Sequence, residues 1–195
     1  MRKYIALGAL MALGVAAPAI AAEGFSYNLV EAGYVSNEIK AEGLDGSGFA
    51  LNGSFEFSES LFGFANLVDA DYDEGSGFST RTLSVGLGYA MPLGRSVDLV
   101  SGFSYENLRL HIDGLGSASE KGFGANVGLR GRVAESLELT GNVKYTDFGH
   151  NLDDFTLSVG GRYYFTPAFA AGIDVSDNDD GTAWTVALRY DFGRR

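Results

Sequence analysis

The final stretch of the chain, Thr182 to Phe192, constrains the fold most strongly because its polarity alternates residue by residue. Its apolar positions are Trp184, Val186, Leu188, Tyr190 and Phe192. The positions between them are Ala183, Thr185, Ala187, Arg189 and Asp191. Strict alternation of this kind predicts a β-strand with one apolar face. A length of about 11 residues suits a tilted strand that crosses a bilayer.

The same alternation recurs along the chain and predicts an all-β fold. Ten segments show it: Phe25–Val35, Gly48–Phe57, Leu61–Tyr72, Thr80–Met91, Val97–Arg109, Lys121–Val133, Leu137–Asp147, Phe155–Phe165, Phe169–Asp177 and Thr182–Phe192. Outside the N-terminus no apolar run is long enough for a membrane helix. We therefore expect a closed, antiparallel, transmembrane β-barrel of ten strands.

The connections between these segments alternate in length, which supports the same interpretation. Short turns lie at 58–60, 92–96, 134–136 and 166–168. Longer or more acidic loops lie at 36–47, 73–79, 110–120, 148–154 and 178–181. Membrane barrels have short turns on one side and longer loops on the other, with an even number of strands. An eight-stranded barrel, with two segments reassigned to loops, and a soluble sandwich or lipocalin-like barrel are the alternatives.

Aromatic residues at the segment ends predict two interfacial rings. The ring at the short-turn end would comprise Phe55, Phe57, Phe62, Phe64, Tyr89, Tyr163, Phe165, Phe169, Tyr190 and Phe192. The ring at the loop end would comprise Tyr34, Phe49, Tyr72, Tyr105, Tyr145, Phe155 and Trp184. Glycines on the opposite face fit a narrow, crowded lumen better than a solvated surface.

The N-terminus has the pattern of a cleaved export signal. Arg2 and Lys3 precede the apolar run Ile5 to Ala17, and Ala19-Ile20-Ala21 is a small-residue cleavage site. We therefore expect a signal peptide over 1–21 and the barrel domain over 22–195. Removal of two bases from 14 leaves 12 against 25 acidic residues, a net charge of 12 − 25 = −13. This charge argues against nucleic acid as a partner.

The polar face predicts a charged lumen. Acidic residues dominate the first five segments, and nearly all inward bases lie on the last five. The network expected to pair across the lumen comprises Glu31, Asp69, Asp71, Glu106, Arg130, Arg132, Lys144, Arg162 and Arg189. Glu56, Asp98, Glu138, Asp174 and Asp191 are expected to face the same interior. Charges in a confined site need partners, so the lumen is either closed by charge pairs or forms a small pore with charged walls.

The loops carry little sign of chemistry. Asn178-Asp179-Asp180-Gly181 lacks the ligand spacing of a calcium loop and fits a tight turn. His111 and His150, with nearby acids and serines, could serve a hydrolase, but polar loop histidines are usually only solvated. There is no cysteine. We therefore expect no cofactor, no metal and no enzymatic activity.

The chain resembles the small outer-membrane β-barrel proteins of the OmpA-like and OmpX-like group over its whole mature length. Thr185, Ala187, Tyr190 and Phe192 resemble the C-terminal signal that the barrel-assembly machinery recognises, although Ala187 replaces the usual glycine and Gly193-Arg194-Arg195 follows. The resemblance implies a monomer in the outer membrane, in contact with lipid and lipopolysaccharide. It implies a structural or surface-interaction role, a small porin-like channel or, as a third alternative, an outer-membrane hydrolase.

Overall fold

The computed structural model describes residues 24–39, 43–72, 77–149 and 153–193. Its elements are ten β-strands: β1 (Leu29–Ile39), β2 (Leu44–Glu56), β3 (Leu61–Tyr72), β4 (Phe78–Pro92), β5 (Val97–Ile112), β6 (Gly116–Ala134), β7 (Leu137–Asp147), β8 (Asp153–Tyr164), β9 (Phe169–Asp177) and β10 (Gly181–Asp191). No helix in these residues is long and apolar enough to cross a membrane. The predicted signal peptide, 1–21, lies outside the described residues.

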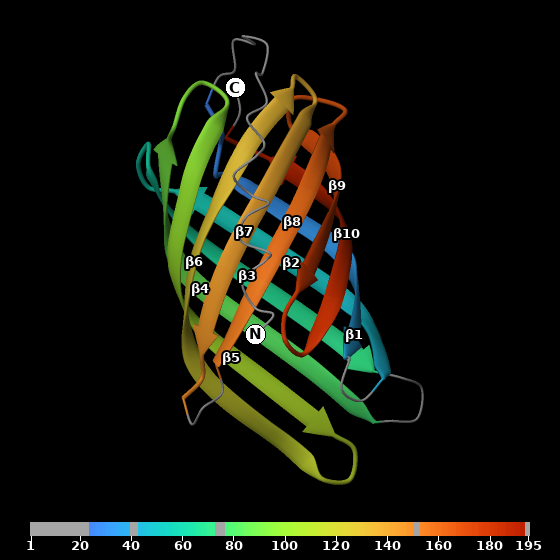
Figure 1. Cartoon of the computed structure of the whole chain (residues 1–195). Helices are drawn as coiled ribbons and strands as arrows, with labels where there is room; N and C mark the ends of the chain where they lie inside the picture. The colour runs from blue at the N-terminus through green and yellow to red at the C-terminus, as the bar shows by residue number, and fades with distance from the viewer. Residues whose placement is uncertain (1–23, 40–42, 73–76, 150–152, 194–195) are drawn as a thin grey trace, which may run out of the picture.

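The strands form one closed antiparallel barrel in which each strand pairs with its neighbours in the chain (Figure 1). Closure is made by β1 and β10, which pair from Leu29 opposite Asp191 to Ile39 opposite Gly181. This pairing leaves no free sheet edge, which is a requirement for strands in a hydrocarbon environment. The predicted ten-stranded barrel is therefore confirmed, and the eight-stranded alternative is excluded.

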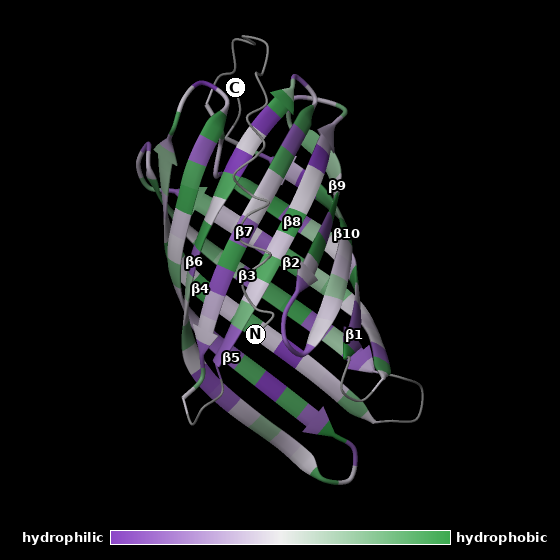
Figure 2. Ribbon diagram, in the orientation of Figure 1, coloured by the Kyte–Doolittle hydropathy of each residue, from purple (hydrophilic) through white to green (hydrophobic). Residues whose placement is uncertain are grey.

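Hydropathy alternates along the strands, as Figure 2 shows. Many of the large apolar side chains are exposed on the outer face. Leu87, Phe103 and Leu188 are each about 60% exposed, on strands β4, β5 and β10. Apolar surface of this extent on one molecule marks contact with a membrane. The soluble sandwich is thereby excluded, because it would bury this face.

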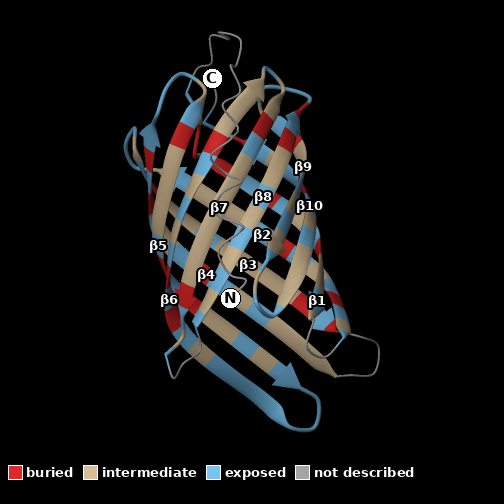
Figure 3. Ribbon diagram, in the orientation of Figure 1, coloured by how far each residue is buried: buried red, intermediate tan, exposed pale blue. Residues whose placement is uncertain are grey.

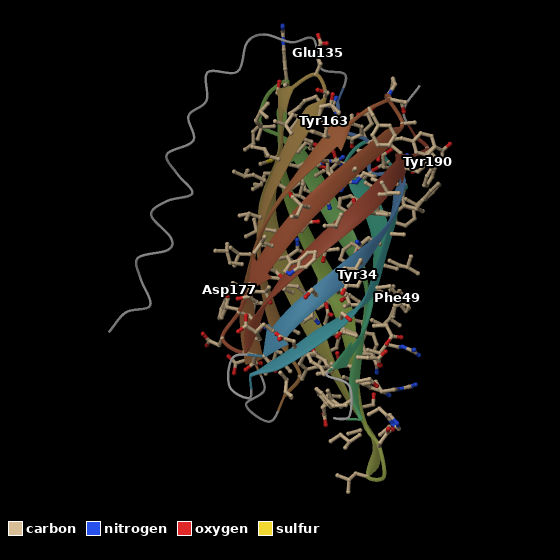
Figure 4. The ribbon with its side chains drawn as sticks, turned by 90° about the vertical axis from the view of Figure 1, so that its right-hand side faces the viewer. Tyr34, Phe49, Glu135, Tyr163, Asp177 and Tyr190 are labelled. Carbon is tan, nitrogen blue, oxygen red and sulfur yellow. The ribbon has the colours of Figure 1, made fainter. Side chains whose placement is uncertain are left out.

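Exposed aromatic residues lie at two levels of the outer face. Tyr163 and Tyr190 lie near the end of the barrel that carries the short turns, and Tyr34 and Phe49 lie farther from it (Figure 4). The two predicted rings are confirmed for most members. Phe62, Phe64 and Tyr72 are exceptions, because they face the lumen.

The hairpin of β5 and β6 is longer than predicted and extends past the other connections (Figure 1). Strand pairing continues to Ile112 opposite Gly116, so most of the predicted loop 110–120 is strand. Gly114 and Gly116 have φ angles of 78° and 99°, which allow the tight reversal at the tip. Most residues at this end of the hairpin are exposed (Figure 3).

The first strand begins at Leu29, so Phe25 to Asn28 of the predicted segment are not strand. Their partners explain the difference. Asn28 and Tyr27 each bond the carboxylate of Glu56, and the carbonyl of Ser26 accepts a hydrogen bond from Arg130. This N-terminal segment, residues 25–28, is therefore held inside the short-turn end of the barrel.

Candidate functional site

The lumen contains a continuous set of paired charges, which we call the lumen network: Glu31, Arg130, Glu138, Arg162, Asp174 and Arg189. Alternation along β1, β6, β7, β8, β9 and β10 turns these side chains inward. Each has at least one outward apolar neighbour on its strand, and Arg189 has two, Leu188 and Tyr190. The network lies in the half of the barrel that carries the short turns.

Glu31 is the centre of one half of the network. Its Oε2 atom lies 2.8 Å from Nε of Arg162 and 2.9 Å from Nε of Arg189. Arg162 also contacts Asp174 of β9, with 2.5 Å between Nη2 and Oδ2. The glutamate therefore joins β1 to β8 and β10 across the closure.

Glu138 is the centre of the other half, and its side chain is 0% exposed. Its Oε1 atom lies 2.9 Å from Nε of Arg130 and 2.8 Å from Nη1 of Arg189. Arg132 lies farther away, 3.9 Å from Oε2. Because Arg189 contacts both glutamates, the two halves form one connected array. Buried charges are tolerated when they are paired and hydrogen-bonded in this way.

The N-terminal segment extends this array to the opposite wall. The hydroxyl of Tyr27 donates a 2.9 Å hydrogen bond to Asp98 of β5, and its ring stacks on Phe62 of β3 with 4.5 Å between centroids. The guanidinium of Arg130 lies 4.8 Å from the centre of the Phe25 ring and 4.9 Å from that of Tyr27. Burial raises the pKa of the Tyr27 phenol well above its usual value, so it remains a donor.

Tyr164 and Asp191 complete this end of the lumen. The Tyr164 hydroxyl donates a 2.8 Å hydrogen bond to Asp191, and Arg132 lies over the Tyr164 ring at 5.7 Å. Asp191 is 1% exposed. Side chains from most of the strands thus contact one another at the short-turn end of the lumen.

A second, smaller group lies nearer the middle of the barrel. Glu106 of β5 accepts 2.5 Å hydrogen bonds from Ser84 and Ser104 and lies 2.8 Å from Nζ of Lys144 on β7. Beside it is a cavity of about 360 Å³, lined by Asn52, Asn66, Asn126 and Asn142 among other residues. This cavity is uncharged over most of its wall and has room for several water molecules.

Two residues predicted in the network, Asp69 and Asp71, lie on the outer face instead. Asp69 is opposite Phe49 in the sheet and forms an ion pair with Arg81, whose side chain is 55% exposed. Asp71 is exposed between buried Ala70 and Tyr72. The prediction was wrong because both faces of β3 contain apolar residues, and its phenylalanines were assigned to the lipid side. Phe62 and Phe64 actually fill the lumen opposite Gly88 and Gly86.

The predicted pairing of acids on the first five strands with bases on the last five is found in part. Glu31 pairs with Arg162 and Arg189 in this way, and Glu106 pairs with Lys144. In contrast, Glu138 pairs with Arg130 of the neighbouring strand, and Asp174 pairs with Arg162 of its neighbour. Glu138 and Asp174 had been expected in the lumen, but their role as the acidic partners was missed. Their surroundings become evident only from the strand register, which places Glu138 directly opposite Arg132 and Arg162. It places Asp174 opposite Gly160, two residues from Arg162 on the same face.

The loop histidines were the predicted candidates for catalysis. His111 lies 2.9 Å from Oγ of Ser117 and 3.2 Å from Oδ1 of Asp113. The side chains of His111 and Asp113 are 48% and 78% exposed. A nucleophile activated by a histidine works in a site that excludes water and stabilises an oxyanion, which this exposed hairpin tip does not provide. His150 lies outside the described residues.

The residues that resemble an assembly signal occupy both faces of β10 and its end. Tyr190 and Phe192 are exposed outward, 6.4 Å apart between ring centroids, in the short-turn ring. Thr185 and Ala187 face inward, and Ala187 is 3% exposed. Their role in assembly remains a prediction.

Gly172 allows Arg162 to reach its partners, and its replacement tests the network. A Cβ atom at this position would overlap Arg162 Cδ and the carbonyl of Gly161. We expect Gly172→Ala to lower the free energy of unfolding by about 1–3 kcal/mol, as in overpacked interiors. Gly161→Ala is the matched control, because its Cβ would meet Leu139 at an ordinary 3.4 Å. Equal unfolding curves in urea for the two variants would contradict this role of Gly172.

These features define a class of protein: a closed, lipid-facing β-barrel with a charged lumen. The sequence matches the family model of the outer membrane protein beta-barrel domain over residues 7–192. The chain therefore belongs to this family and is an outer-membrane protein, related to the small OmpA-like and OmpX-like barrels. No curated protein sequence matches it.

Solved structures with a similar fold include three small barrels. Neisserial surface protein A has 13% identity and a TM-score of 0.49, and the match covers 87% of this chain and 100% of that protein. The KdgM porin in complex with oligogalacturonate has 12% identity and a TM-score of 0.47, with 84% and 99% covered. The Ail protein of Yersinia pestis has 14% identity and a TM-score of 0.41, with 83% and 93% covered.

Proposed function

We propose that this outer-membrane barrel has a structural or surface-interaction role, and that its lumen is closed to solutes. A continuous series of side-chain contacts supports this proposal. It runs from Asp98 through Tyr27, Arg130, Glu138 and Arg189 to Glu31. These contacts pair the charges with one another, so they leave no row of unpaired charged groups that could replace the hydration shell of a passing ion. The function of the protein would then depend on contacts made by its outer surface and loops, and not on a catalysed reaction.

The polar cavity beside Lys144 supports a second candidate, a small pore. A cavity of about 360 Å³ is comparable to small-molecule sites. For conduction, the cavity would have to connect with the short-turn end past Tyr27 and Arg130. The two candidates therefore differ in whether the contacts around these two residues stay closed.

Conductance distinguishes the two candidates. We expect no stable current steps from the refolded mature protein in a planar bilayer. Combined Arg130→Ala and Arg132→Ala should produce steps, because it removes the cations over Phe25 and the bond to the Ser26 carbonyl. Both proteins must first show heat-modifiable migration, which demonstrates a folded barrel.

Arg81→Ala is the matched control for this experiment, since it removes a cation from the outer face and should remain silent. Steady conductance in the wild-type protein, equal to that of the double variant, would overturn closure and establish the pore. Silence in the wild type with steps in the double variant would support closure by the N-terminal segment.

A further inference from the structure

Exposed cations of the described residues gather in one place on the outer face. Arg81 of β4, Arg109 of β5 and Lys121 of β6 are exposed there, and we call these three residues the cationic patch. The fourth exposed base among the described residues, Arg95, lies in a short turn at the opposite end. This concentration is notable in a chain whose net charge is −11.

The strand register places the three cations side by side. Arg81 is directly opposite Arg109, and Lys121 is opposite Asn107, two residues from Arg109 on the same face. Residues directly opposite have Cβ atoms about 5 Å apart, and like charges in such positions destabilise a sheet. A bound anion would remove this repulsion.

Only part of the charge is neutralised within the protein. Asp69 forms an ion pair with Arg81. Within the described part of the chain, neither Arg109 nor Lys121 forms an ion pair. The exposed carboxylates of Asp71 on β3 and Asp147 on β7, which is opposite Phe123, lie on the same outer face, but among the described residues neither forms an ion pair with Arg109 or Lys121. Arg109 and Lys121 are therefore the cations available to an external group.

The cationic patch lies directly above the apolar band at the loop end. Leu83, Tyr105 and Phe123 point outward two to four residues nearer the membrane on the same three strands, and all are exposed. Two residues of a tilted strand correspond to about 5 Å of height. The cations are therefore at the level of lipid headgroups, whereas acyl chains would contact the residues below.

We propose that the cationic patch binds the phosphate groups of a phosphorylated glycolipid in the outer leaflet. The loop end faces this leaflet because the start of β1, the end of β10 and the short turns lie on the opposite side, as in outer-membrane barrels. Arg109 can donate to two phosphate oxygens at once, and Lys121 supplies a point charge beside it. The proposal rests on the outer-membrane location and does not depend on closure of the lumen.

The surroundings of the cationic patch also favour a lipid over a soluble anion as its ligand. The hairpin of β5 and β6 rises above the cationic patch and is exposed on the same face. A glycolipid headgroup would lie against this hairpin, with its phosphate on the cations and its acyl chains on Tyr105 and Phe123. A free phosphate would use only the cations.

Binding of fluorescent bisphosphorylated lipid A to the refolded barrel in detergent micelles tests this assignment. Combined Arg109→Ala and Lys121→Ala should weaken binding roughly twenty-five-fold, at about fivefold for each surface cation. Arg109→Lys should retain most of the affinity. Arg95→Ala, a cation of the opposite end, should leave affinity unchanged.

Several outcomes would overturn the assignment. One is affinity of the double variant within twofold of the wild type, with both barrels folded by heat-modifiable migration. Another is equal binding of lipid A from which both phosphates have been removed. Displacement of lipid A by inorganic phosphate at the same concentration would show a site for a free anion and would refute the lipid.

Discussion

Replacement of Glu138 by Ala is expected to lower the free energy of unfolding of the barrel by about 3–5 kcal/mol. The carboxylate is fully buried and contacts Arg130 and Arg189 at 2.9 Å and 2.8 Å. Its removal leaves Arg130 without its carboxylate partner and leaves Arg189 with Glu31 alone. Removal of one partner from a buried charge cluster is far more costly than replacement of the whole cluster.

Urea titration of the protein refolded into lipid vesicles measures this effect. Glu138→Gln should cost less than Glu138→Ala, since the amide keeps the shape and one acceptor oxygen. Asp69→Ala is the matched control, because it breaks an ion pair whose arginine is half exposed, and such pairs contribute about 0–1 kcal/mol. If Glu138→Ala and Asp69→Ala have the same midpoint and slope, the lumen network does not stabilise the barrel.

Replacement of Phe192 by Ala is expected to reduce strongly the amount of assembled protein in the outer membrane. Phe192 follows the last strand, is 45% exposed and lies beside Tyr190 in the short-turn ring. The proposed partner is the barrel-assembly machinery, which would recognise this end before the barrel closes. The level of heat-modifiable protein in isolated outer membranes measures the effect.

Phe57→Ala is the control for assembly, because Phe57 is an exposed aromatic of the same ring, 64% exposed, outside the signal-like strand. Both variants lose similar lipid contact, so only recognition distinguishes them. Refolding of purified Phe192→Ala into vesicles should proceed as for the wild type. Equal membrane levels of the two variants would refute a specific role of Phe192 in assembly.

Alternation of residue types was sufficient to predict the strand number and the closed architecture. One face of each strand contacts lipid and the other contacts the polar lumen. The lipid-facing side chains of β10 must therefore be apolar from Trp184 to Tyr190. The inward positions of Glu31, Glu106, Arg130, Lys144, Arg162 and Arg189 follow from the same rule. Their partners do not, because the partner of a side chain depends on the register and tilt of strands far apart in the sequence.

Alternation failed where one strand has apolar residues on both faces. In β3, Phe62 and Phe64 are inward because Gly88 and Gly86 on β4 leave room for their rings. This fit between large and small residues involves two strands, so the sequence of β3 alone does not predict it. The length of the β5–β6 hairpin was missed for a different reason. In the outer part of β5 the apolar residues change face, from Phe103 and Tyr105 to Leu108, Leu110 and Ile112, and the facing part of β6 is exposed and has no apolar period.

The N-terminal segment has a consequence for how the molecule forms. Tyr27 contacts Asp98 across 71 positions, Arg162 contacts Glu31 across 131, and Arg189 contacts Glu31 across 158. The first needs the N-terminal segment and β5, and the two contacts of Glu31 exist only when strands from both ends of the chain have met. Contacts of such long range slow folding. The contacts inside the lumen would therefore form last, after the strands have paired. A chain whose folding stopped halfway would be an open sheet with a water-filled concave face lined by charged side chains, until its first and last strands pair.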